Sequence, residues 1–141
     1  PQTDLEIIQQ AGIFGDYSQT EQQTLKDWRD FDTTLRNELV KLRASRKHIP
    51  AAPYLRNETF PEQAIVHVAL GAQKNIYPLE AEKSLDRLRW DFLEQISFGH
   101  YFDLDYLIIY AHKLFILEKW SRINAADTQH ITMRGVVGVE Q

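Results

Sequence analysis

Five histidines are the residues of this sequence best suited to bind a metal ion or to transfer a proton: His48, His67, His100, His112 and His130. Zinc-binding histidines on a helix recur four residues apart or combine with cysteines. No two of the five are four residues apart, no HExxH motif occurs, and the sequence contains no cysteine. We therefore predict no metal site, and we expect His112 to be a hydrogen-bonded or half-buried core residue.

A second group, His100, Asp103 and Asp105, has the chemistry of an acid, a base and an orienting group. Aspartates at the start of a helix are also favoured by N-capping and by the helix macrodipole, without any catalytic role. The sequence has no nucleophile elbow, no phosphate-binding P-loop and no dinucleotide-binding glycine motif. We predict a structural role for the three residues, and no enzymatic activity, catalytic residue or cofactor.

The composition favours one folded domain that works with protein partners. The 141 residues are 43% hydrophobic, and 16 basic against 20 acidic residues give a net charge of -4. This charge provides no general attraction for nucleic acid, and the absence of cysteine is typical of a reducing compartment. We expect a cytoplasmic protein whose residues 1–141 form a single helical domain. Because the sequence starts at Pro1, we also expect it to be part of a longer chain.

The elements that would position these residues are predicted to be helices. Apolar residues at helical spacing indicate a first helix over Asp4–Ile13. Ser18 and Glu21 form a capping-box pattern, which predicts that a long helix begins there and continues to about Lys47. Its apolar positions follow helical periodicity and include Leu25, Trp28, Leu35, Leu39 and Leu42. Two prolines then predict a flexible linker near residues 48–60.

Two further helices are predicted from proline at a first helical position. One begins at Pro61 and ends near Gly71, and the other begins at Pro78 and ends near Gly99. The second has a regular apolar stripe formed by Leu85, Leu88, Phe92 and Ile96. The fold class is therefore all-α, an antiparallel helical bundle.

A helix near residues 103–121 is predicted to lie at the centre of the bundle. Asp103 can cap its start, and apolar residues occupy nearly all of its faces, which predicts neighbours on several sides. Its apolar run contains His112 and Lys113 and is shorter than the ~20 residues that a membrane span needs. The pattern in residues 127–141 is compatible with a short helix or a strand-like end.

The same segment resembles a known family. Its motifs are Phe102-Asp103, Tyr110 to Lys113 and Glu118 to Trp120. Over about 25 residues these resemble the last long helices of the d subunit of the V-type (archaeal-type) ATPase. They are even more similar to an uncharacterised bacterial family encoded among V-type ATPase subunits.

The resemblance implies a non-catalytic, all-helical adaptor for ion transport that links the rotor ring to the central stalk. Its partners would then be rotor and stalk subunits, and it would reach the cytoplasmic face of the membrane only through them. The alternative is a free-standing helical module for protein–protein interaction. The motifs Phe102-Asp103 and Glu118 to Trp120 favour the adaptor.

Overall fold

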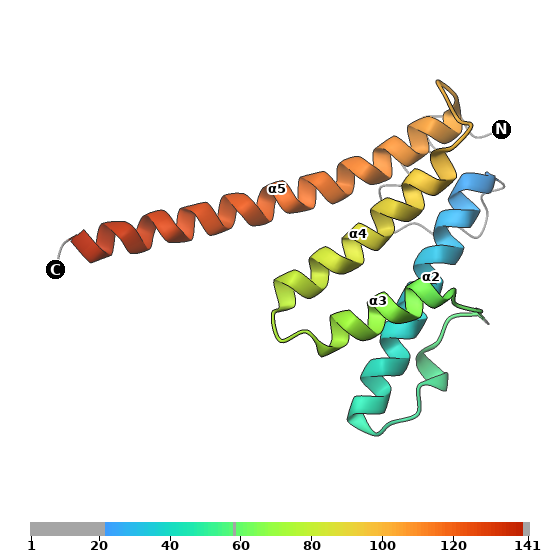
Figure 1. The fold of residues 1–141 in the computed structure, drawn as a ribbon, viewed down its shortest axis with the longest axis horizontal. Helices are drawn as coiled ribbons and strands as arrows, with labels where there is room; N and C mark the ends of the chain where they lie inside the picture. Colours follow the sequence, from blue (N-terminus) through green and yellow to red (C-terminus); the bar gives the residue numbers. More distant parts are fainter. Residues whose placement is uncertain (1–21, 58, 140–141) are drawn as a thin grey trace.

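The computed structural model describes residues 22–57 and 59–139, with side chains as far as residue 135, and this part of the chain is helical (Figure 1). The elements are α2 (Gln23–Lys47), the short 3-10 helix η2 (Ala52–Tyr54), α3 (Gln63–Lys74), α4 (Pro78–Ser97) and α5 (Leu104–Val139). They pack as a helical bundle, which confirms the predicted all-α class.

The long helix α2 begins at Gln23, after Gln22 as its N-cap, and not at the predicted capping box. Ser18 and Glu21 lie outside the described residues, as does the helix predicted over residues 4–13. At the other end, His48 adopts a left-handed conformation with a φ of 55°. The amides of His48 and Ile49 then donate to the last turn of α2, which ends the helix before Pro50 is reached.

The linker near residues 48–60 is attached to α2 by one buried side chain. Asn37 Nδ2 donates to the carbonyl of Arg56 at 2.8 Å and to Thr59 Oγ1 at 3.1 Å. Asn37 Oδ1 accepts the amide proton of Arg56 at 3.0 Å. A buried amide that is satisfied in this way fixes the path of the linker over α2.

The two proline signals have different outcomes. Helix α4 begins at Pro78, as predicted. Helix α3 begins at Gln63 with Glu62 as its N-cap, so the prediction of Pro61 as its first residue is wrong. The extended backbone of Glu62 separates Pro61 from the helix. Helix α3 also continues beyond the predicted end at Gly71 to Lys74.

The main core lies between α2, α3 and α4. Phe31 of α2 and Phe92 of α4 stack with ring centroids 4.1 Å apart and an angle of 8° between the planes. Helix α3 contributes the small residues Ala69 and Ala72, which let the helices approach closely. The buried members of this core are Phe31, Leu35, Ile65, Ala69, Ala72 and Leu85.

The helix predicted at the centre is instead at the edge of the bundle. Helix α5 packs against α4 and the start of α2 along one side, and its second half extends beyond the other helices (Figure 1). Among its described side chains, Ile108, Ile109 and His112 are the buried ones. Among the described residues, the predicted neighbours on several sides of this helix are absent, because an apolar surface all around a helix does not supply the helices needed to cover it.

The segment from residue 127 onwards continues α5 to Val139 as part of the same helix. A strand-like end is therefore excluded for residues 127–139. Over the described residues, no helix combines the length and the hydropathy that crossing a membrane requires.

Candidate functional site

The turn between α4 and α5 brings together the three residues that the sequence singled out. His100 Nδ1 lies 2.7 Å from Asp103 Oδ2 and 3.7 Å from Asp105 Oδ2. The three side chains are half-buried and come from a stretch of six residues. We call His100, Asp103 and Asp105 the polar knot.

Asp103 is the N-cap of α5, as predicted. Its Oδ1 accepts the amide proton of Tyr106 at 2.8 Å, and its main-chain oxygen accepts that of Leu107 at 3.2 Å. These bonds satisfy amides that a helix start otherwise leaves without partners. The cap determines the direction in which α5 leaves the turn.

Asp105 joins the turn to the start of α2. Its Oδ1 accepts a hydrogen bond from Gln22 Nε2 at 2.6 Å and another from Thr24 Oγ1. The two helices are more than 80 positions apart in the sequence, so helix periodicity gave no sign of this contact. The polar knot therefore holds three helix ends together: the end of α4 and the starts of α5 and α2.

The charges in the knot support one another. The hydrogen bond to Asp103 raises the pKa of His100 above its ordinary value, and the same bond lowers the pKa of Asp103. The donor atoms of His100, Asp103 and Asp105 lie within 4.8 Å of one another, a set that could approach one cation. Yet each carboxylate already accepts hydrogen bonds from the protein, and a protonated His100 offsets part of their combined charge. The geometry thus fits the structural role.

Four exposed aromatic side chains come from the same turn and the start of α5, and we call Phe98, Tyr101, Phe102 and Tyr106 the aromatic tip. The first three are exposed almost fully or by more than two thirds, and Tyr106 is exposed by 40%. The rings of Phe102 and Tyr106 have centroids 6.4 Å apart. Aromatic side chains with this exposure are typical anchors of protein interfaces.

Phe102 combines exposure with backbone strain. Its side chain is 99% exposed, and its φ of 60° places it in the left-handed region. A large non-glycine residue in that region costs about 1–2 kcal/mol. The sequence analysis missed the aromatic tip, since aromatic residues usually lie in cores. The available signal was the position of Phe98, Tyr101 and Phe102 around Gly99, outside any helical stripe.

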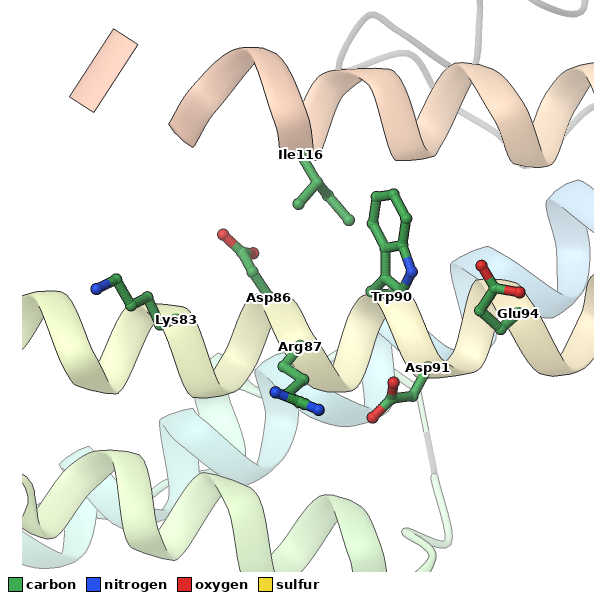
Figure 2. Close-up of a pocket in the computed structure, with 7 residues that line it drawn as sticks. All are labelled: Lys83, Asp86, Arg87, Trp90, Asp91, Glu94 and Ile116. Atoms are coloured by element: carbon green, nitrogen blue, oxygen red, sulfur yellow. The ribbon is translucent and has the colours of Figure 1, made fainter. Parts of the chain in front are cut away.

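Apart from the turn, an open groove of about 580 Å³ lies between α4 and α5 and is lined mainly by residues of α4. In Figure 2, Trp90 and Ile116 point toward each other across it, whereas Arg87 and Asp91 point away from α5. The lining residues are Lys83, Asp86, Arg87, Trp90, Asp91, Glu94 and Ile116. None of the polar-knot residues belongs to this lining, so the knot and the groove are separate features.

The groove is built around helix-to-helix contacts. The buried carboxylate of Asp86 accepts bonds from Arg89 at 2.6 Å, from Lys119 at 2.7 Å and from Trp120 Nε1 at 2.9 Å. Lys113 Nζ lies 5.3 Å from the centroid of the Trp90 ring and bonds to Glu94. These contacts tie α4 to α5, so we interpret the groove as part of the packing between them.

The remaining histidines are dispersed. His48 ends α2, and His67 and His130 are exposed on α3 and α5. His112 is buried, as expected, but its Nε2 has no hydrogen-bond partner among the described residues. The hydrogen bond that the sequence analysis gave as one alternative is not formed at this nitrogen, and the imidazole ring packs against Trp28. Burial lowers the pKa of His112 to about 4.

Comparison with known proteins identifies one family. Residues 56–138, which include α3, α4 and nearly all of α5, match the family described as "Protein of unknown function (DUF2764)". A search of the curated proteins finds no match, and neither does a search of the solved structures. The match covers more than half of the chain, so the chain belongs to the DUF2764 family.

Proposed function

We propose that the protein is a non-catalytic helical adaptor that binds a V-type ATPase through the aromatic tip. The observation that carries the proposal is the state of Phe102, an almost fully exposed aromatic residue on a strained backbone. Phe102 and Asp103 are also the first motif of the resemblance to V-type ATPase-associated proteins. Phe102 belongs to the aromatic tip, and Asp103 caps α5.

The energetic argument starts from the strain. A phenylalanine whose backbone is in the left-handed region, and whose side chain contributes no packing, destabilises the fold by about 1–2 kcal/mol. Backbone strain of this kind is concentrated at functional sites, where a binding partner gives the strained residue a role. The polar knot keeps the turn in this conformation through the bonds of Asp103 and Asp105 to α5 and α2. The turn is thus prepared for binding before the partner arrives.

Interfaces concentrate their binding energy in a few buried aromatic and arginine anchors. Phe98, Tyr101 and Phe102 would serve as such anchors on an apolar pocket of a partner subunit. The resemblance suggests a partner in the rotor ring or the central stalk, and the protein would link the two. Contact with the membrane would then be indirect, through those subunits.

Co-purification of the full-length protein from its native membranes tests this function. Mass spectrometry of the purified material is expected to identify V-type ATPase rotor or stalk subunits. Isolation of the protein alone would contradict the adaptor function. Isolation with an unrelated protein in stoichiometric amount would also contradict it, and would favour the free-standing interaction module.

A further inference from the structure

Helix α4 carries a row of charged side chains along the open groove between α4 and α5. The members of the row are exposed and follow one another at steps of four, four and three residues, so they share one face of the helix. They are Lys83, Arg87, Asp91 and Glu94, and we call them the charge row. The first two are basic and the last two are acidic, so the sign of the charge reverses once, between Arg87 and Asp91.

The two central members of the charge row have no partner in the described part of the chain. There, neither the Arg87 guanidinium nor the Asp91 carboxylate forms a hydrogen bond or an ion pair. They are four residues apart, but the order of base before acid is the less favourable one for pairing on a helix. Both side chains point away from α5 in Figure 2. By contrast, Lys83 and Glu94 each bond to one residue of their own chain.

The charge row is complementary to a second copy of itself that runs in the opposite direction. When two α4 helices lie antiparallel, a twofold axis midway between positions 87 and 91 places Arg87 of each copy beside Asp91 of the other. The same register brings Lys83 to within one residue of Glu94 of the second copy. A parallel pairing in register would instead place like charges against each other. The pattern of charges therefore favours a second copy of this chain, in the antiparallel direction.

We propose that the protein forms a symmetric dimer in which the two α4 helices pack antiparallel along this groove. Trp90 lines the groove one position from the axis, so each copy provides an aromatic side chain near the centre of the contact. The charge row is about 17 Å long, which makes a small interface, and we expect a dimer that dissociates on dilution. This proposal is independent of the V-type ATPase function, because it involves neither the aromatic tip nor the polar knot.

Sedimentation velocity over a wide range of concentrations tests the dimer with the 141-residue chain, and charge reversal tests its register. Arg87→Glu brings two acids together at both equivalent contacts, and Asp91→Lys brings two bases together there. Each variant alone is expected to raise the dissociation constant at least about tenfold, since every ion pair is replaced by a repulsion. An equimolar mixture of the two variants is expected to regain the dimer. In the mixed dimer, the new glutamate of one chain faces the new lysine of the other.

The matched control is Arg46→Glu, which changes the net charge by the same amount at an exposed position in the last turn of α2. This variant should associate like the unchanged chain, and circular dichroism checks that every variant is folded. A chain that stays monomeric at every concentration would overturn the proposal. A dimer that Arg87→Glu does not weaken would also overturn it and would place the contact on another face. A mixture of the two variants that remains monomeric would contradict the antiparallel pairing.

Discussion

Trp28 of α2 and His112 of α5 lie ring against ring, with centroids 4.6 Å apart and an angle of 35° between the planes. His112 is only 5% exposed, and its Nε2 has no hydrogen-bond partner in the described part of the chain. The imidazole therefore acts as a neutral aromatic side chain in the contact between the two helices. Protonation would place an unpaired charge in this apolar contact.

This relationship predicts a loss of stability in acid. Burial lowers the pKa of His112 to about 4, below its ordinary value of 6.5. The stability from the neutral imidazole is complete above pH 6.5 and falls as the pH decreases toward 4, because the unfolded chain binds the proton first. The full difference corresponds to about 3 kcal/mol. Urea unfolding at pH 7.5 and pH 5 measures about 2 kcal/mol of this difference, and the rest is lost only as the pH falls through 4.

The matched control is His112→Phe, which keeps an aromatic ring beside Trp28 and removes the titration. Its free energy of unfolding is expected to fall less between pH 7.5 and pH 5 than that of the unchanged protein. His100 has the opposite sign, since its pKa is raised and its contribution is lost as the pH rises through the folded value. Identical pH profiles for His112→Phe and the unchanged protein would refute the assignment to His112.

The edge position of α5 predicts different costs for two similar truncations. Ile108→Ala removes a fully buried side chain and is expected to destabilise the fold by about 2–5 kcal/mol. Leu114→Ala changes a residue that is 44% exposed, and it should cost less than half as much. A helix with neighbours on several sides, as predicted from the sequence, would make both truncations costly. Chemical denaturation of the two variants and of the unchanged chain measures both costs, and equal costs would contradict the edge position of α5.

Asp86 is expected to be the most important charged residue in the packing of α4 against α5. Asp86→Ala removes a buried carboxylate that accepts three hydrogen bonds, for a cost of about 1–3 kcal/mol, since Arg89 and Lys119 keep Glu82 as a partner. Asp91→Ala, an exposed position on the same helix, should change stability by less than about 0.5 kcal/mol. Equal thermal shifts for the two variants would show that the Asp86 contacts contribute little.

Phe102→Gly should make the isolated protein more stable. Glycine adopts a positive φ without the steric cost, and the phenylalanine side chain is too exposed to contribute packing. The expected gain is about 1 kcal/mol, measured by urea unfolding. Phe60→Gly is the control, since Phe60 is 92% exposed but has no positive φ, and it should not stabilise the fold. A loss of stability for Phe102→Gly would mean that the side chain supports the turn.

The sequence predicted the features that depend on neighbouring residues. Pro78 starts α4 and Asp103 caps α5 because both effects act within one helical turn. The contact between Gln22 and Asp105 depends on how distant helices are arranged, and no local pattern contains that information. The predicted burial of α5 on several sides is not found among the described residues for a related reason. Hydrophobicity shows that a residue can be buried, but not whether a neighbour is present to bury it.

The candidate site was predicted in part. His100, Asp103 and Asp105 were identified as a group with a structural role, and the observed bonds agree with that role. The aromatic tip was missed because its exposure follows from the left-handed backbone of Phe102 and the sharp turn at Gly99. Both are properties of the folded turn rather than of the residue types alone.

Quantitative co-purification of matched variants is the most direct test of the adaptor function. Phe102→Ala and Phe60→Ala each remove one exposed phenylalanine, but only Phe102 belongs to the aromatic tip. We predict that Phe102→Ala reduces the recovery of V-type ATPase subunits from native membranes at least about tenfold, as for an interface anchor, while Phe60→Ala retains full recovery. Equal recovery with both variants would contradict binding through the aromatic tip.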